Sequence, residues 1–280
     1  MVKKYKNLQP PLKWVGGKRQ LIPEIEKYFP EDYSRYYEPF VGGGAVLFHF
    51  HPTRAVVNDF NEELINYYHV VKDNIEGLIS ELSKEKYGND SDSFYTIRAL
   101  DRSIDYTSLS KVERAARIQY LNKTCYNGLY RVNSKGEFNV PFGKYKNPDI
   151  VNAEVLRDVS RYFNENDIRI LNGDFEDAVK YIRKGAFVYF DPPYHPISDT
   201  SSFTSYSSNG FDESEQIRLK RLCDRLDDRG VKFLLSNSAS KFILDLYSDY
   251  KIKKIPARRS INSNGEKRGP VMEVLIRNYD

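Results

Sequence analysis

The sequence predicts an α/β fold with a mostly parallel sheet that is interrupted once by a long insertion. A short strand at 36–41 runs through three glycines into an apolar stretch at 45–48, the order of a nucleotide-binding βα unit. The stretch 186–190 reads AFVYF and is apolar throughout, which is typical of a strand buried on both faces. Between them, the strand pattern stops after 54–58 and resumes only at 168–171, a gap far longer than one crossover.

Length and composition favour one large globular domain with an insertion. The chain has 280 residues, where a domain averages about 150; 40% of its residues are hydrophobic and 29% are charged, as in globular proteins. Its two cysteines are too few for a disulfide framework or a cysteine-rich metal site. No stretch approaches 18 apolar residues, and the first residues lack the apolar part of a secretory signal. We therefore expect a soluble cytoplasmic protein with no metal and no membrane contact.

Positive charge is concentrated in two parts of a chain whose net charge is only +4. Residues 111–149 hold eight lysines and arginines against three acids, and residues 251–269 hold seven against one. Basic clusters on a nearly neutral chain indicate a polyanionic partner such as nucleic acid. The alternative is that both clusters are solvated faces.

The elements of the first half alternate and then change character. The strand at 54–58 ends at Asp59, which lies 15 residues beyond the last glycine of the turn. In nucleotide-binding folds, an acidic residue about 20 residues beyond the glycine turn binds the ribose hydroxyls. Apolar residues at helical spacing then predict a helix over 62–82. A second helix is expected over 110–124, with Ser110 as N-cap and a capping-box glutamate three residues later. Residues 129–140 favour a β-hairpin around a Ser-Lys-Gly turn.

After the insertion the α/β pattern resumes. The strands at 168–171 and 186–190 are followed by a helix over 214–229, which Gly230 closes. Further strands are expected at 231–237 and 272–276. The helical and hairpin insertion, which carries one basic cluster, looks like an added recognition domain.

The residues directly after the apolar strand at 186–190 suit the chemistry of an exocyclic amine. Asp191 stands at the carboxyl end of a buried strand, where ligands bind in open α/β sheets. Pro192 and Pro193 remove two backbone donors, so that nearby carbonyls can face a ligand. The ring of Tyr194 offers a stacking surface. Carboxylate and carbonyl can accept both N–H groups of an amine and keep its lone pair available for attack. The alternative is a loop with a capping aspartate.

Several motifs occur along the chain in a fixed order. They are KWVGGK from Lys13 to Lys18, EPFVGGG from Glu38 to Gly44, Asn58-Asp59, and Asp191-Pro192-Pro193-Tyr194. YNGLYR and GEFNVPFGKY in the insertion and RRSINSNG near the end extend the pattern over nearly the whole chain. In this order the motifs resemble the Dam family of α-class, or D12, DNA adenine-N6 methyltransferases.

The resemblance implies a fold, a division of the chain and a reaction. It implies a Rossmann-like S-adenosylmethionine-dependent methyltransferase sheet with an inserted helical and β-hairpin DNA-recognition domain. Residues 1–61 and 166–280 would form the catalytic domain, and residues 62–165 the target-recognition domain. The expected reaction transfers a methyl group from S-adenosylmethionine to adenine N6 in double-stranded DNA at GATC, after the base is flipped into the Asp-Pro-Pro-Tyr pocket. The expected setting is a bacterial or phage-infected cell.

The resemblance also assigns a cofactor site. The implied catalytic residues are Asp191, Pro192, Pro193 and Tyr194. The implied cofactor-binding residues are Trp14, Lys18, Phe40, Gly42, Gly43, Gly44, Asp59, Asp174, Phe175 and Asp191. Several of these residues have an alternative: Trp14 could be a core residue, Asp59 a helix cap, and Asp174 and Phe175 an ordinary turn. A nicotinamide site is disfavoured, because no glycine stands at position 47.

For DNA, the resemblance assigns the insertion and the N-terminal motif. The implied contacts are Lys13 to a guanine, Tyr126 and Asn127 at the site of the flipped base, Leu129, Arg131 and Pro141 to base edges, and Lys123, Asn133, Asn139, Lys144 and Lys146 to phosphates. Arginine is the natural bidentate partner of guanine in the major groove. For each lysine, a solvated charge is the alternative.

Other activities remain open at this stage. Methylation of adenine in RNA, or of a protein amide, uses similar chemistry, although amide methylators carry Asn where Asp191 stands. A non-catalytic DNA-binding module would have lost these motifs. We expect His195 to be structural and Cys125 to be a buried side chain rather than a nucleophile, because no histidine and acid accompany it.

Overall fold

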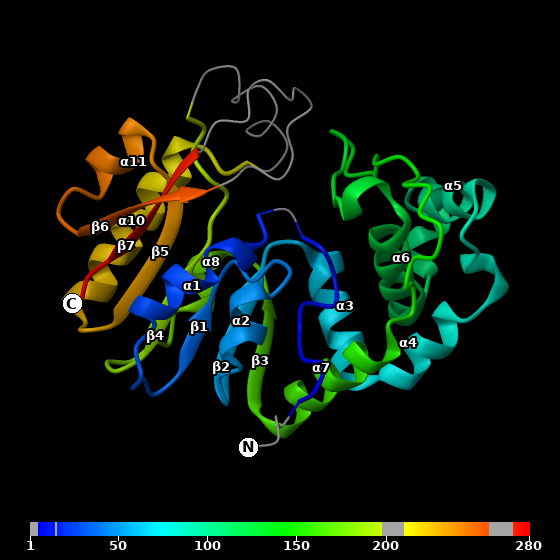
Figure 1. The fold of residues 1–280 in the computed structure, drawn as a ribbon, viewed down its shortest axis with the longest axis horizontal. Coiled ribbons are helices and arrows are strands. Elements are labelled where there is room, and N and C mark those ends of the chain that lie inside the picture. The colour runs from blue at the N-terminus through cyan, green and yellow to red at the C-terminus, as the bar shows by residue number, and fades with distance from the viewer. Residues whose placement is uncertain (1–4, 15, 198–209, 258–270) are drawn as a thin grey trace. The chain divides into compact units, whose positions relative to one another are not determined.

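The computed structural model (Figure 1) describes residues 5–14, 16–197, 210–257 and 271–280. The chain divides into two compact units. Unit 1 comprises Met1–Lys18 and Val41–Gly173, and unit 2 comprises Arg19–Phe40 and Asp174–Asp280. The strands belong to a seven-stranded sheet with the order β3-β2-β1-β4-β5-β7-β6. The expected α/β fold class is thereby confirmed. The expected division into catalytic and recognition domains is a division by function, and it stays a prediction.

The described residues of unit 2 form five strands. They are β1 (Tyr36–Glu38), β4 (Phe187–Phe190), β5 (Lys232–Ser238), β6 (Lys251–Ala257) and β7 (Val271–Arg277). β1, β4 and β5 pair in parallel, β7 runs antiparallel to β5, and β6 runs antiparallel to β7. The described helical segments are η1 (Lys18–Gln20), α1 (Ile22–Ile25), η2 (Glu26–Tyr28), α8 (Phe175–Ala178), α10 (Glu213–Asp228) and α11 (Lys241–Leu246).

β4 forms the centre of the hydrophobic core of unit 2. All four of its residues are 0% exposed, which confirms the burial predicted from the apolar run. Phe187 pairs with Tyr36 of β1 on one side and with Lys232 of β5 on the other. Because β4 ends at Phe190, Asp191 is the first residue beyond the buried strand. β1 is shorter than the expected strand at 36–41, since Pro39 follows it and cannot donate to a ladder.

Sequence analysis missed β6. The strand lies in the second basic cluster, where Lys253 and Lys254 interrupt the alternation of Ile252 and Ile255. It stands last in the strand order, and an edge position tolerates lysines and the proline that it contains. The rest of that cluster and the RRSINSNG motif, from Arg258 onward, lie outside the described residues.

In the described part of unit 1, two strands are combined with a set of helices. β2 (Arg54–Asp59) and β3 (Asp167–Asn172) pair in parallel over six residues. The described helices are α2 (Ala45–Phe50), α3 (Glu62–Asp73), α4 (Ile75–Leu82), α5 (Ser91–Ala99), α6 (Lys111–Thr124) and α7 (Ala153–Glu165). The 3-10 turns are η3 (Glu85–Tyr87), η4 (Leu100–Arg102), η5 (Ile104–Ser108) and η6 (Tyr126–Gly128). No helix among the described residues is long and apolar enough to cross a membrane.

Two expectations for the insertion need correction, and one is confirmed. The single helix over 62–82 is wrong, because Asn74 breaks it with φ −147° and its side chain accepts the N–H of Gly77 to cap α4. The expected hairpin over 129–140 has less β-pairing than predicted: one isolated bridge joins Val132 and Phe138, in place of two regular strands. The capping box of α6 at Ser110 is present as predicted.

Candidate functional site

The glycine turn of unit 1 is tied to the end of β2. Gly42 and Gly44 adopt φ values of 48° and 73°, in the left-handed region that favours glycine. The carboxylate of Asp59 accepts the N–H of Gly42 at 2.9 Å through one oxygen and the N–H of Asn61 at 2.9 Å through the other. Burial raises the pKa of Asp59, although these two N–H donors act against the shift. The N-cap of α3 is Asn61 and not Asp59, so the capping alternative for Asp59 is excluded.

Trp14 packs directly against this turn. A Cβ atom added to Gly42 would lie 2.9 Å from Trp14 Cδ1, and one added to Gly43 would lie 2.9 Å from Trp14 Cβ. The indole also stacks on the ring of Tyr130 at 4.8 Å, with 20° between the planes. Trp14 thus contacts both the glycine turn and the start of the hairpin, and its side chain is partly exposed. Lys18 is 6% exposed, and its ammonium donates to the carbonyl of Gly16 at 2.6 Å.

A single buried amide links the N-terminal motif to the turn after α6. Asn122 accepts the N–H of Lys13 at 2.9 Å and donates to the Lys13 carbonyl at 2.6 Å. It also donates to the carbonyl of Gly128 at 3.1 Å. The backbone of Lys13 is thus fixed beside η6, while the lysine side chain is exposed. Sequence analysis missed Asn122, which is 2% exposed in the middle of a helix.

The turn η6 presents an aromatic ring. Tyr126 is 54% exposed, and Asn127 beside it adopts φ 57°. The N–H of Tyr126 donates to the carbonyl of Pro141 at 2.9 Å, so two predicted DNA contacts that lie 15 positions apart in sequence come together. The thiol of Cys125 is buried, and burial raises its pKa to about 12, as expected for an unreactive side chain.

The hairpin arranges two further predicted residues as a pair. Arg131 Nε donates to Asn139 Oδ1 at 2.7 Å across the hairpin, and the Arg131 side chain is exposed. Asn133 instead shapes the turn, because its amide oxygen accepts the N–H groups of Lys135 and Glu137, both at 3.0 Å. The other predicted contacts in this region are exposed at Lys144 and Lys146 and half-buried at Lys123 and Leu129.

In unit 2, Asp191 belongs to a chain of hydroxyl groups. Ser236 of β5 donates to Asp191 Oδ1 at 3.0 Å, and the hydroxyl of Tyr189 lies 2.9 Å from that of Ser236. An ionised carboxylate can only accept hydrogen bonds, so the Ser236 hydroxyl donates its one proton to Asp191. The Ser236 oxygen then accepts the hydrogen bond that the Tyr189 hydroxyl donates. Tyr189 is 0% exposed. Burial, and then the charge of Asp191, raise its pKa well above the usual value, so the phenol keeps its proton.

Buried amides hold the loop that follows. Gln216 of α10 donates to the carbonyl of Pro193 at 2.8 Å, and Asn237 of β5 donates to Gln216 at 3.1 Å. Asn237 also accepts the N–H of His195 at 3.1 Å. The hydroxyl of Tyr194 donates to Glu273 at 3.0 Å. Sequence analysis missed Ser236, Gln216 and Asn237; the signal was a polar Ser-Asn-Ser sequence ending an otherwise apolar strand.

The histidine after the motif has structural contacts. One ring nitrogen of His195 lies 3.1 Å from a carboxylate oxygen of Glu213, and the ring stacks on Phe242 at 4.7 Å.

The start of α8 brings three further predicted residues into contact. Asp174 caps α8 by accepting the N–H of Glu176, and Arg218 grips both its oxygens at 3.1 and 2.6 Å. Burial alone would raise the pKa of Asp174, but the donors outweigh it and hold the pKa below its usual value. The ring of Phe175 lies 5.3 Å from that of Phe40, and the guanidinium of Arg218 lies 4.2 Å from its centre. Arg218 was also missed by sequence analysis.

Comparisons with known proteins place these motifs in one family. Residues 14–261 match the model of D12 class N6 adenine-specific DNA methyltransferases. The Type II methyltransferase M1.LlaDCHI of Lactococcus lactis subsp. cremoris is 49% identical over 98% of this chain and 96% of its own. The Type II methyltransferase M.MjaIII of Methanocaldococcus jannaschii is 44% identical over 97% and 99%. The DNA adenine methylase of Haemophilus influenzae is 34% identical over 95% and 92%.

Proposed function

Because the chain belongs to the D12 class of N6 adenine-specific DNA methyltransferases, we propose that it methylates adenine N6 in double-stranded DNA at GATC, with S-adenosylmethionine as donor. The observation that carries the proposal is the setting of Asp191. This carboxylate stands half-buried at the end of the buried strand β4, and Ser236 fixes one of its oxygens. The carboxylate is therefore held in an orientation in which it can accept a hydrogen bond from an N–H group placed beyond the end of the strand.

The described residues fit the proposed cofactor. The glycine turn lies directly against Trp14, since side chains at Gly42 and Gly43 would collide with that residue, and we assign both the turn and Trp14 to the cofactor. Asp59 is assigned to ribose hydroxyls, and the ammonium of Lys18 to the cofactor's carboxylate. When bound, S-adenosylmethionine supplies a methyl group on a positively charged sulfur.

Unit 2 also holds residues that we assign to the cofactor. Asp174 and Phe175 are assigned to the adenine of the cofactor, with Phe40 packed against Phe175. Arg218 keeps the Asp174 carboxylate ionised and oriented, which is the state that accepts an amine hydrogen bond.

For the target amine, we assign two acceptors. Asp191 accepts one N–H of adenine N6 and the carbonyl of Pro192 accepts the other, so the nitrogen lone pair stays available for attack. The neighbouring carbonyl of Pro193 is already bonded by Gln216, which fixes the chain at this point. Tyr194 offers its ring for stacking, and its bond to Glu273 fixes the hydroxyl end of the side chain. The nitrogen would take the methyl group as the carbon–sulfur bond of the donor breaks, and it would then release one proton to solvent.

The DNA-facing roles fall to unit 1. The reacting nitrogen is inaccessible in a stacked duplex, so the adenine must be turned out. We assign exposed Tyr126 and Asn127 to the space that it leaves, and Lys13 and Arg131 to guanines. Leu129 and Pro141 would exclude wrong bases. The remaining polar residues of this surface are assigned to phosphates: Lys123, Asn133, Asn139, Lys144 and Lys146.

The test is methyl transfer by the purified protein. Labelled S-adenosylmethionine is supplied with a GATC duplex, a duplex with the same composition and no GATC, the single strands, and RNA. Mass spectrometry of the nucleosides should show N6-methyladenine in the GATC duplex at the highest initial rate. Equal rates on both duplexes would refute the GATC assignment, and faster methylation of RNA would replace DNA as the substrate.

Asp191→Ala tests the carboxylate. Transfer should be lost while DNA binding is kept, and Asp177→Asn, which alters an exposed carboxylate of the same unit, serves as control. Near-normal turnover in Asp191→Ala would remove Asp191 from the mechanism.

A further inference from the structure

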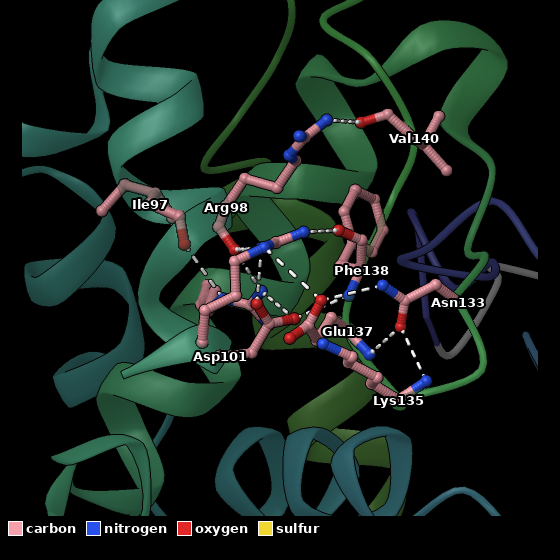
Figure 2. Close-up of polar contacts among 10 residues, drawn as sticks. Ile97, Arg98, Asp101, Asn133, Lys135, Glu137, Phe138 and Val140 are labelled. Carbon is pink, nitrogen blue, oxygen red and sulfur yellow. Dashed lines mark hydrogen bonds and ion pairs between the residues drawn. The ribbon is translucent and has the colours of Figure 1, made fainter. Parts of the chain in front are cut away.

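The hairpin 131–140 is fastened to the rest of unit 1 by an ion cluster centred on Asp101 (Figure 2). One Asp101 oxygen accepts from Arg102 Nη1 at 2.8 Å. The other accepts from Arg117 Nη2 at 2.7 Å and from the backbone N–H of Phe138 at 2.7 Å. A carboxylate in η4, directly after α5, therefore bonds two arginines and the hairpin backbone at once. We call Arg98, Asp101, Arg102 and Arg117 the hairpin clamp.

The arginines of the hairpin clamp add bonds to hairpin carbonyls. Arg102 Nη2 donates to the carbonyl of Phe138 at 2.7 Å, and Arg98 Nη1 donates to that of Val140 at 3.2 Å. Arg117 is 3% exposed and donates through Nε to the carbonyl of Ile97 at 3.0 Å, which joins α6 to α5. Three hairpin backbone groups are thus held by charged side chains, and hydrogen bonds to charged groups are the stronger kind.

The clamp compensates for a weakly paired hairpin. The two arms share one isolated bridge, between Val132 and Phe138, and a lone two-stranded hairpin is marginal in water. A buried ion pair such as Asp101 with Arg117 adds little net stability, because desolvation offsets the attraction. The ion pair instead determines position: through the bond from the Phe138 N–H to Asp101, it fixes the place of Phe138 against η4 and α6.

Phe138 is connected to the exposed Arg131 through the residue that follows it in the chain. The next residue, Asn139, donates its N–H to the carbonyl of Arg131 at 3.0 Å and accepts from Arg131 Nε at 2.7 Å. Both the backbone and the guanidinium of Arg131 are therefore hydrogen-bonded to the arm of the hairpin that Asp101 holds in place.

We propose that Asp101 is a positioning residue for target recognition, which sets the discrimination between DNA sequences by fixing the hairpin that carries Arg131. The inference rests on the proposed reading of DNA by this hairpin. Bidentate recognition of a base edge tolerates only about 0.5 Å of misplacement. Loosening the hairpin should therefore weaken the correct contact more than the contacts to phosphates, which are the same for every sequence.

The experiment compares three variants. Asp101→Asn removes the charge that Arg117 and Arg102 share, and Arg102→Gln removes one tie to Phe138 from a more exposed position. Glu81→Gln is the matched control, because the Glu81 side chain is 7% exposed, close to the 10% of Asp101, and pairs with Lys84 and Lys86 without touching the hairpin.

Two measurements decide the outcome. The first is the ratio of kcat/KM for a GATC duplex to that for duplexes with one base pair changed. It should fall about tenfold in Asp101→Asn, less in Arg102→Gln, and not in Glu81→Gln. The second is amide hydrogen exchange at Phe138 and Asn139, which should accelerate in the first two variants only. Affinity for S-adenosylmethionine should stay unchanged in all three.

Each failure has its own signature. An unchanged ratio, or an equal loss on all duplexes, overturns the positioning role, and so does unchanged hairpin exchange. If Asp101→Asn does not fold, Arg102→Gln decides alone. Absence of methylation by the wild-type protein refutes the proposed function, and the exchange measurement still shows whether the clamp holds the hairpin.

Discussion

Replacing Ser236 by alanine tests the chain of hydroxyl groups behind Asp191. The change removes the donor to Asp191 Oδ1 and leaves the hydroxyl of Tyr189, which is 0% exposed, without its acceptor. A hydrogen bond to a charged group contributes about 1.5–3 kcal/mol, and an unsatisfied buried hydroxyl costs about 1–3 kcal/mol. If the two contributions add, we expect the free energy of unfolding to fall by about 2.5–6 kcal/mol.

The second half of this prediction is a double-mutant cycle. Tyr189→Phe alone should cost little, because Ser236 still donates to Asp191. In the Ser236→Ala background the same change should restore about 1–3 kcal/mol, because it removes the orphaned hydroxyl. Urea unfolding of the four proteins measures the coupling.

Methyl transfer supplies the functional readout. Ser236→Ala should lower kcat about 10- to 100-fold if one charged hydrogen bond orients the carboxylate. The KM for DNA should change little. Strictly additive losses of stability would refute the hydrogen bond between Tyr189 and Ser236, and an unchanged kcat would refute the orienting role of Ser236.

Three further predictions follow from the site. Arg131→Ala should cost about 1–3 kcal/mol of discrimination at one base pair; methylation rates on singly substituted duplexes test this, and a uniform loss would make Arg131 a phosphate contact. Asn122→Ala should free the backbone of Lys13 and weaken DNA binding in a filter or anisotropy assay, with cofactor affinity unchanged; equal weakening of both would contradict the local role. Asp174 has a lowered pKa when folded, so its contribution to stability is present above the unfolded value near 3.8 and is lost as the pH falls through the lower folded value. Urea unfolding between pH 2 and 5 should show this loss, and Arg218→Gln should flatten it.

Local signals in the sequence predicted the elements that depend on local patterns. The apolar run before Asp191 gave the buried strand β4, and the capping box at Ser110 gave the start of α6. The helix over 62–82 failed because its apolar periodicity continues through Asn74, where a side-chain cap competes with the helix backbone. β6 escaped notice because an edge strand keeps lysines that mask alternation.

The supporting residues of the site could not be predicted in the same way. Asn122, Gln216 and Asp101 act on backbone groups that lie far away in sequence, at Lys13, Pro193 and Phe138. A polar residue in a helix gives no local sign of a distant partner. The motif residues were recognisable because they form contiguous runs, whereas the residues that position them are scattered over the chain.

The lysines of β6 have a consequence for how the protein behaves in a crowded cell. β6 ends the strand order, so one side of its backbone has no neighbour in that order. Lys251, Lys253 and Lys254 are exposed there, and charge repulsion discourages a second copy from adding its own strand. A change of these lysines to threonine would leave the chain folded but turn this rim into a template for self-association.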